Sequence, residues 1–344
     1  MGLAACGGSS DGEEGSGKHK LVLGVPLPAM EMGYATLAVA QNRGFFADED
    51  LDVEVQFLKD SSGPLKALAA GNVDIVSATA DATLAARAEG EDVRLIFNST
   101  KRSNQYYATL PDSDIEDVDD MLGKKIGVAT LESGAKLTSD LALNFAGHDA
   151  EDVEYIATGV GAPALDALQR GRVDVLAMWA QAYKEMERTG AELNYIAPES
   201  TSLLFGTGFS SSAESIEENA EALKGFGRAW ARATLVYAMD PEGAVQDVWD
   251  LYPNTRTGDD DISEAAETLQ AGAEYKFEAD VDPRTYKEWG TYDEKAVQAW
   301  IDAVVLLGLS DGEEDVADVY TNEFADFYND FDPADACEKC APEK

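Results

Sequence analysis

The chain has 344 residues, of which 66 are Asp or Glu and 26 are Lys or Arg, and 45% are hydrophobic, giving a net charge of −40. Phosphate binding needs clustered Lys and Arg, and a membrane-spanning helix needs about 18 or more consecutive apolar residues, so the sequence excludes a nucleic-acid-binding protein and an integral membrane protein. Surface carboxylates in this excess are typical of proteins kept soluble in high salt. An ordinary acidic secreted protein is the alternative.

The first residues carry a lipoprotein motif. Leu3-Ala4-Ala5-Cys6, followed by two glycines and two serines, has the pattern of a bacterial lipobox, in which cleavage precedes the Cys and a lipid is attached to its sulfur. Because only two residues precede the motif, we interpret residues 1–19 as a trimmed lipobox remnant and a flexible tether. Cys6 is predicted to be lipidated, which implies an extracytoplasmic lipoprotein that contacts the cell membrane through this anchor only. A chance occurrence of the motif is the alternative.

The next segment is predicted to form an α/β lobe, because short apolar strands alternate in it with helical periodicity. In chain order its elements are a strand over 20–26, a loop over 28–34, a helix over 35–43, a strand ending near 55, a helix from Pro64 to Gly71, a strand that follows at once, and a strand over 93–97.

One unit of this lobe recurs one hundred residues later. Ala67-Leu68-Ala69-Ala70-Gly71-Asn72-Val73-Asp74-Ile75-Val76 matches Ala167-Leu168-Gln169-Arg170-Gly171-Arg172-Val173-Asp174-Val175-Leu176. In each copy a Pro opens a helix, a Gly ends it and a β-branched strand follows. The repetition predicts two lobes of similar topology, with a ligand cleft between the carboxyl ends of their strands.

The rest of the chain completes the second lobe and returns to the first. The polar segment 98–109 is expected to cross to the second lobe, where a helix end at 115–123 feeds a strand at 125–129, and 202–211 to cross back. Helices are predicted over 216–238, 247–252, 262–273, 292–307 and 316–327. The expected organisation is a tether (1–19), lobe one with the C-terminal helices (20–103 and 208–336), lobe two (104–207) and a C-terminal tail (337–344).

Two cysteines lie in that tail. Cys337 and Cys340 form a lone C-x-x-C motif, for which we favour a local disulfide. A zinc site would need two further ligands and the sequence offers only His19 and His148. A redox role is less favoured, because a redox C-x-x-C motif is expected at the start of a helix in a βαβ unit, whereas this one lies in a terminal tail rich in Pro, Asp and Glu. Two idle thiols are the remaining alternative.

Several motifs together resemble a known family. They are the lipobox, Ala38-x-x-x-x-Arg43-Gly44-Phe45-Phe46, Leu122-Gly123-Lys124-Lys125-Ile126-Gly127-Val128 and the two repeat units, and the match covers about residues 20–330. This arrangement resembles the solute-binding proteins of ABC transporters for nitrate, sulfonates, taurine and thiamine-pyrimidine precursors. The resemblance implies an α/β type II periplasmic-binding-protein fold with a two-strand hinge and a helical C-terminal region. It also implies capture of a small molecule by lobe closure and delivery to permease subunits, by a monomer without cofactor, metal or catalytic activity.

The candidate ligand-binding residues lie after the strands of both lobes. Helix starts near Gly63 and Gly134 present free N–H groups to an anion, and Tyr34 and Trp179 could enclose a planar or methylene group. Ser61 and Ser133 could instead only cap helices, and Tyr34 could belong to the core. The full set is Glu31, Met32, Tyr34, Asp60, Ser61, Ser62, Thr79, Asp81, Asn104, Thr130, Ser133, Gly134, Trp179, Gln181 and Phe205.

The charges in these loops bear on the ligand. The predicted site loops contain four acidic residues, Glu31, Asp60, Asp81 and Glu132, and the one basic residue near them is Lys136. This balance favours a zwitterion or a neutral nitrogen heterocycle over a simple anion as the ligand. An enzyme of the same fold, a pyrimidine-forming relative, carries a Cys-rich iron motif and a His. This sequence has no Cys between the first and the last two. A lipid-anchored sensor that presents its ligand to a receptor is the other alternative.

Overall fold

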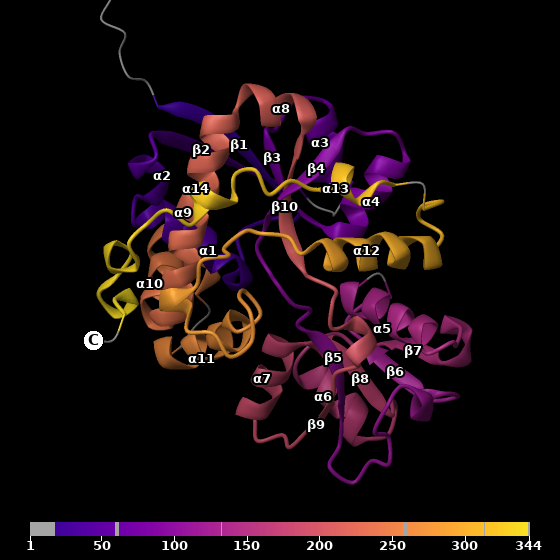
Figure 1. Cartoon of the computed structure of the whole chain (residues 1–344). Coiled ribbons are helices and arrows are strands. Elements are labelled where there is room, and N and C mark those ends of the chain that lie inside the picture. Colours follow the sequence, from indigo (N-terminus) through magenta and orange to yellow (C-terminus); the bar gives the residue numbers. More distant parts are fainter. Residues whose placement is uncertain (1–17, 59–61, 132, 257–260, 313, 343–344) are drawn as a thin grey trace, which may run out of the picture.

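The computed structural model describes residues 18–58, 62–131, 133–256, 261–312 and 314–342, and it divides the chain between two five-stranded sheets (Figure 1). Cys6, Asp60 and Ser61 lie outside the described residues. The chain crosses between the sheets twice, at residues 99–104 and 197–206. The predicted pair of α/β lobes joined by two crossings is therefore confirmed.

The two sheets have equivalent strand orders, β2-β1-β3-β10-β4 in lobe one and β7-β6-β8-β5-β9 in lobe two. In each, the strand that follows a crossing runs antiparallel to its neighbours, while the remaining strands are parallel to one another. The first sheet consists of β1 (His19–Val25), β2 (Leu51–Phe57), β3 (Ile75–Thr79), β4 (Val93–Asn98) and β10 (Thr207–Ser212). The second consists of β5 (Gln105–Thr109), β6 (Lys125–Val128), β7 (Glu154–Ala157), β8 (Val175–Trp179) and β9 (Asn194–Ile196).

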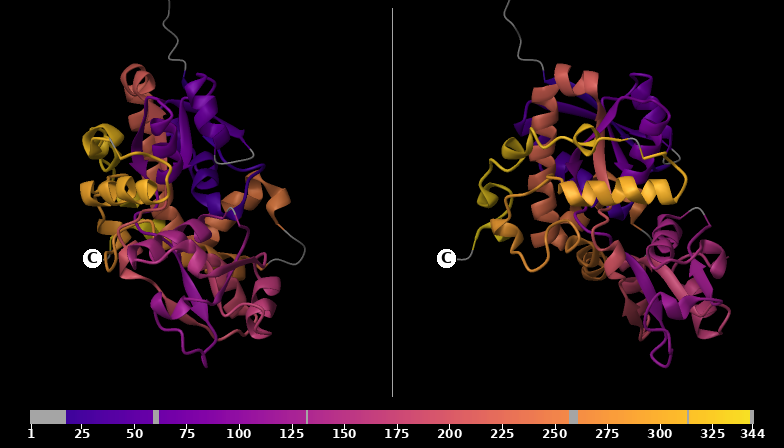
Figure 2. Two further views of the ribbon diagram at one scale, coloured as in Figure 1. Left: turned by 90° about the vertical axis from the view of Figure 1, so that its right-hand side faces the viewer. Right: turned by 45° about the vertical axis from the view of Figure 1, so that its right-hand side comes forward.

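Helices cover both sheets, and those of the C-terminal region pack mainly on lobe one (Figure 2). None of the helices in the described ranges has the length and apolar character that would let it span a membrane. Lobe one holds α1 (Ala35–Asn42), α2 (Phe45–Asp48), α3 (Ser62–Ala69) and α4 (Ala80–Ala88), and lobe two holds α5 (Gly134–Phe145), α6 (Ala162–Gln169) and α7 (Ala180–Arg188). The C-terminal helices are α8 (Ala213–Glu218), α9 (Ala220–Met239), α10 (Pro241–Leu251), α11 (Ile262–Ala273), α12 (Glu294–Leu306), α13 (Val316–Val319) and α14 (Ala325–Tyr328).

The repeated sequence folds into the same device in both lobes. Gly71 and Gly171 end α3 and α6 with φ angles of 67° and 66°, in the left-handed region that favours glycine. The Asp that follows then locks the new strand to its neighbour: Asp74 accepts a hydrogen bond from the backbone N–H of Val22 (2.7 Å), and Asp174 accepts one from Lys125 (2.8 Å). The Val-Asp pair of the repeat therefore sets the register of both sheets.

The predicted helix over 316–327 is wrong as a continuous element. Its residues form α13 and α14, separated by an extended stretch in which Tyr320 bridges Leu95 and the N–H of Thr321 donates to the Leu95 carbonyl (2.9 Å). Because β4 is an edge strand of its sheet, this stretch covers backbone groups that would otherwise be unpaired. The predicted helix over 216–238 is likewise divided at Asn219 between α8 and α9. The helix end predicted within 115–123 is only a single 3₁₀ turn, Asp119–Met121.

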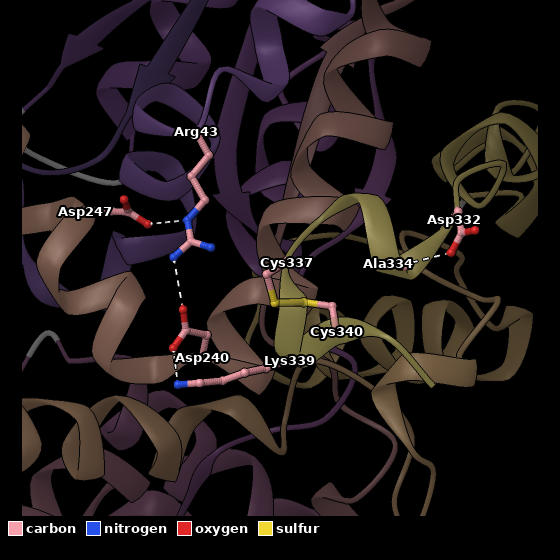
Figure 3. Close-up of a disulfide and its surroundings, with 8 residues drawn as sticks. All are labelled: Arg43, Asp240, Asp247, Asp332, Ala334, Cys337, Lys339 and Cys340. Carbon is pink, nitrogen blue, oxygen red and sulfur yellow. Dashed lines mark hydrogen bonds and ion pairs between the residues drawn. A yellow bond between two sulfur atoms is a disulfide. The ribbon is translucent and has the colours of Figure 1, made fainter. Parts of the chain in front are cut away.

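The C-terminal tail contains a local disulfide and is joined to lobe one by a chain of charges (Figure 3). Cys337 is bonded to Cys340, whose side chain is fully buried. Between them in the sequence, Lys339 reaches Asp240 (2.6 Å), which also pairs with Arg43 (3.3 Å). Arg43 in turn pairs with Asp247 (2.7 Å). The tail is thus connected through Asp240, at the α9–α10 junction, to Arg43 at the end of α1, and through Arg43 to Asp247 within α10.

Candidate ligand site between the lobes

One cavity receives side chains from both lobes. It has a volume of about 50 Å³, which is smaller than a complete site for an organic ligand, and residues of both crossings contribute to its wall. Five of the residues predicted from the sequence lie in its wall, namely Thr79, Asp81, Asn104, Gly134 and Phe205. Its other wall residues are Ser103, Gln105, Leu137, Thr138, Leu204, Gly206 and Trp300.

The lobe-one wall is acidic but buried. Asp81 stands in the first turn of α4, where burial raises the pKa of its carboxyl and hydrogen bonds from Thr79 and from the N–H groups of Asp81 and Ala82 oppose that rise. A partly desolvated carboxylate of this kind is a strong acceptor for a ligand N–H. The hydroxyl of Tyr34 lies 3.0 Å from that of Ser77, and burial raises the pKa of Tyr34, so the phenol stays neutral.

The lobe-two wall is built from amides. The side-chain amide of Asn104 donates to Gln181 (3.2 Å), while the Asn104 carbonyl accepts from the N–H of Ala180 (2.9 Å). Gln105 pairs with Trp179 across the β5–β8 ladder and accepts a hydrogen bond from Thr138 (2.5 Å). These bonds fix the end of β8 and the start of α7 against the first crossing.

The start of α5 shows how Ser133 and Lys136 are held by this helix. Ser133 caps the helix, because its hydroxyl accepts a hydrogen bond from the N–H of Lys136 (3.4 Å). The ammonium of Lys136 is held by Asp140 (2.7 Å) and stands 4.4 Å from the Tyr155 ring centroid. The one base that the sequence placed near the site loops is therefore already paired with a carboxylate.

The other predicted residues are distributed over both rims. Glu31 and Thr130 are exposed after β1 and β6, and Met32 packs against the lobe-one core. Trp179 ends β8 half-buried against the lobe-two core, and Phe205 is fully buried against Tyr292 and Trp300. Ser62 is the first residue of α3. Their role in ligand binding stays a prediction.

The structure adds residues that sequence reasoning missed. Gln105 and Thr138 belong to the cavity wall. Gln105 could have been found from the sequence, because it is a polar residue at the start of the strand that pairs with Trp179. Helix α11 also contacts both α7 and the turn Met32–Tyr34, so it bridges the lobes. Arg188 of α7 pairs with Glu264 of α11, and a side chain at Gly272 would collide with the amide of Gln181.

The chain matches the family described as NMT1/THI5 like over residues 32–244, which is more than half of its length. The protein belongs to this family. A curated relative, 4-amino-5-hydroxymethyl-2-methylpyrimidine phosphate synthase of Legionella pneumophila, is 27% identical over 229 residues, which cover 65% of this chain and 71% of that protein.

Solved structures confirm the periplasmic-binding-protein fold. The periplasmic aliphatic sulphonate binding protein SsuA from Escherichia coli superposes with a TM-score of 0.66 at 17% identity, covering 87% of this chain and 91% of that one. The alkanesulfonate-binding protein SsuA from Xanthomonas axonopodis pv. citri, bound to MOPS, gives a TM-score of 0.60 at 17% identity and coverages of 88% and 98%. At these identities the likeness establishes the fold.

Proposed function

We propose that the protein is the extracytoplasmic, lipid-anchored solute-binding component of an ABC importer. The observation that carries this proposal is the cavity in which Thr79 and Asp81 of lobe one face Gln105 and Gly134 of lobe two beside the crossings. A ligand bridging these walls would favour the state in which the lobes are closed on it. Delivery to permease subunits and attachment to the membrane through Cys6 are parts of the same proposal.

The proposed ligand is a small organic molecule, either a taurine-like sulfonate or a nitrogen heterocycle of the vitamin-precursor type. The partly desolvated carboxylate of Asp81 supports a ligand with N–H donors, and the amides of Asn104 and Gln105 can both donate and accept. The SsuA proteins of the same fold are named for sulfonates, which supports the first class.

An enzymatic role is the second candidate, because the Legionella relative is named as a synthase. The pyrimidine-forming enzymes that the sequence resembles use a Cys-rich iron motif, whereas this chain has no Cys between Cys6 and Cys337. That difference supports binding without chemistry. The test is to incubate the protein with a bound ligand for a prolonged time and then analyse the ligand. Unchanged ligand supports a binding role, and chemical conversion of the ligand would show that the protein is an enzyme.

A thermal-shift screen at low and high salt tests the binding role. The panel holds taurine, alkanesulfonates, nitrate, thiamine-pyrimidine precursors, riboflavin and amino acids, and a true ligand at a hundredfold excess over its Kd would stabilise the fold by about 2.7 kcal/mol. Trp179→Ala is expected to lose the shift, whereas Tyr252→Ala, at the end of α10, serves as the control. A panel without any shift in the salt-stabilised protein argues against the proposal.

The proposed anchor has its own test. Expression of the chain behind a complete signal peptide should place the wild-type protein in the membrane fraction and incorporate labelled fatty acid, and Cys6→Ser should release it. Equal membrane association of both proteins would contradict lipidation at Cys6.

A further inference from the structure

A second and larger cavity lies against the same two crossings. Its volume of about 670 Å³ is within the range of about 300–1,000 Å³ that small-molecule pockets have, and we call it the hinge cavity. Lys101 and Arg102 of the first crossing line it, together with Ser202 and Leu203 of the second and with residues between 278 and 329 of the C-terminal region. None of the described residues lines both the hinge cavity and the interlobe cavity of the candidate ligand site.

The wall formed by the first crossing carries hydrogen-bond donors. Lys101 uses two of its three N–H groups, on the carbonyl and the hydroxyl of Thr291 (2.5 and 2.6 Å), which leaves one for a ligand. Arg102 donates from Nη2 to the Glu274 carbonyl (2.6 Å), while its Nε is buried without a partner among the described residues. In the described ranges neither cation has a carboxylate in ion-pair contact, although 66 residues of the chain are acidic.

Asn98, the last residue of β4, adds an unsatisfied amide to this wall. The residue is only 4% exposed and lines the hinge cavity, and its Oδ1 atom has no hydrogen-bond partner among the described residues. An unpaired buried amide oxygen costs about 1–3 kcal/mol, so native proteins seldom keep one without a water or a ligand beside it. Because the terminal torsion of an Asn side chain is soft, rotation presents either the oxygen or the NH₂ group to the cavity.

The wall formed by the C-terminal region carries exposed carboxylates, those of Glu278, Glu288, Asp293 and Asp326. Lys287 is a base on the same wall, and its ammonium donates to the Phe331 carbonyl (3.4 Å). Burial lowers the pKa of Lys101 to about 8, and three of the carboxylates, those of Glu278, Glu288 and Asp293, oppose this fall. The carboxylates therefore lie within electrostatic reach of the Lys101 ammonium across the cavity.

The charges of the two walls select the kind of ligand. A simple anion would be attracted by the first crossing but repelled by the C-terminal carboxylates, and a simple cation would meet the reverse. We propose that the hinge cavity is a second binding site, which takes a small zwitterion with its anionic group toward the first crossing and its ammonium toward the C-terminal carboxylates. Such a molecule complements both walls at once. This inference goes beyond the proposed transport function, because the described walls of the two cavities are separate.

A groove filled only with water is the competing explanation, because charged side chains at a protein surface need no ligand. Two variants remove charge from opposite walls. Lys101→Met removes the ammonium, and the double variant Glu278→Gln/Glu288→Gln replaces two exposed carboxylates by neutral groups of the same shape. The double variant keeps the test valid if Lys101→Met fails to fold. Glu214→Gln/Glu217→Gln is the matched control, because both carboxylates are exposed on α8, outside the hinge cavity.

Isothermal titration with glycine, β-alanine, 4-aminobutyrate and 6-aminohexanoate tests the site, since this series increases the separation of the two charges. Wild type and the control are expected to bind at least one of these zwitterions, and the two charge variants to bind it at least tenfold more weakly. Propionate and propylammonium, which carry one charge each, are expected to bind wild type at least tenfold more weakly than that zwitterion does. Trp179→Ala, altered in the candidate ligand site between the lobes, is expected to bind it as wild type does.

Four outcomes would overturn the inference. The first is that no zwitterion of the series binds, and the second is that both charge variants, with unchanged circular dichroism spectra, bind as wild type does. Equal affinity for propionate or propylammonium would refute the zwitterion as the ligand class. Loss of zwitterion binding in Trp179→Ala, with binding retained in the two charge variants, would assign the zwitterion to the site between the lobes and refute a second site.

Discussion

Replacing Lys276 by Met should stabilise the ligand-free protein. A pKa of about 8 in place of the ordinary 10.5 corresponds to about 3.4 kcal/mol at 1.36 kcal/mol per pH unit, as the penalty for holding the ammonium in the fold. Part of this is offset, because the side chain keeps some solvent contact and its attraction to the Tyr237 ring contributes about 0.5–1 kcal/mol. We expect Lys276→Met to raise the free energy of unfolding by about 1–2 kcal/mol at neutral pH.

The pH dependence of this gain has a definite sign. Below the folded-state pKa of about 8 the lysine is charged in both states, so the penalty is fully present and the variant has its largest advantage. Between about 8 and 10.5 the folded protein releases the proton first, wild type becomes relatively more stable, and the difference should close. Tyr237 does not interfere, because burial raises its pKa above the ordinary value.

Urea denaturation followed by circular dichroism measures the difference, in high salt so that the net charge of −40 does not dominate. Lys224→Met is the control, because Lys224 also stands over a ring, that of Phe324 (5.7 Å), but is paired with Glu221. Loss of this surface ion pair should change the free energy of unfolding by less than about 0.5 kcal/mol. A Lys276→Met variant that is less stable than wild type, or whose advantage is the same at every pH, would refute the reasoning that this ammonium is desolvated.

Three further predictions concern the fold. Gly127→Ala should cost about 1–3 kcal/mol in urea denaturation, because its methyl group would lie 2.7 Å from Leu176, and an unchanged midpoint would contradict this close packing. Asp74→Ala should cost more than Asp174→Ala in the same assay, since the first carboxylate is half-buried and the second exposed; the reverse order would disprove the register lock. Cys340→Ser, or a reductant, should speed proteolytic removal of the tail, and unchanged cleavage would show that the disulfide does not hold it.

The lobes were predictable because their signals are local. A Pro at the start of a helix, a Gly with positive φ at its end and a Val-Asp pair on the next strand all lie within about a dozen residues, and both copies fold as expected. The helix predicted over 316–327 fails for the opposite reason. Its backbone pairs with Leu95, more than two hundred residues away, and no local pattern reports that the edge of β4 needs covering.

The residues of the candidate site likewise divide into those that the sequence could predict and those that depend on distant packing. Thr79, Asp81, Asn104 and Gly134 could be chosen from the ends of predicted strands and the starts of helices, because topology alone brings such positions together. Thr138 could not, because its place in the cavity depends on how α5 packs against β5. The pairing of Lys136 with Asp140, by contrast, could have been read from the sequence, because opposite charges four residues apart lie on the same face of a helix.

The two repeats place Asp81 and Gln181 at equivalent positions, each in the first turn of the helix that follows the repeated strand. The C-terminal region then makes their surroundings different. Asp81 stays in the wall of the interlobe cavity, whereas Gln181 is covered by α11 and bonded to Asn104 and Tyr237. The C-terminal region thus gives a symmetric pair of lobes a cavity whose two sides differ.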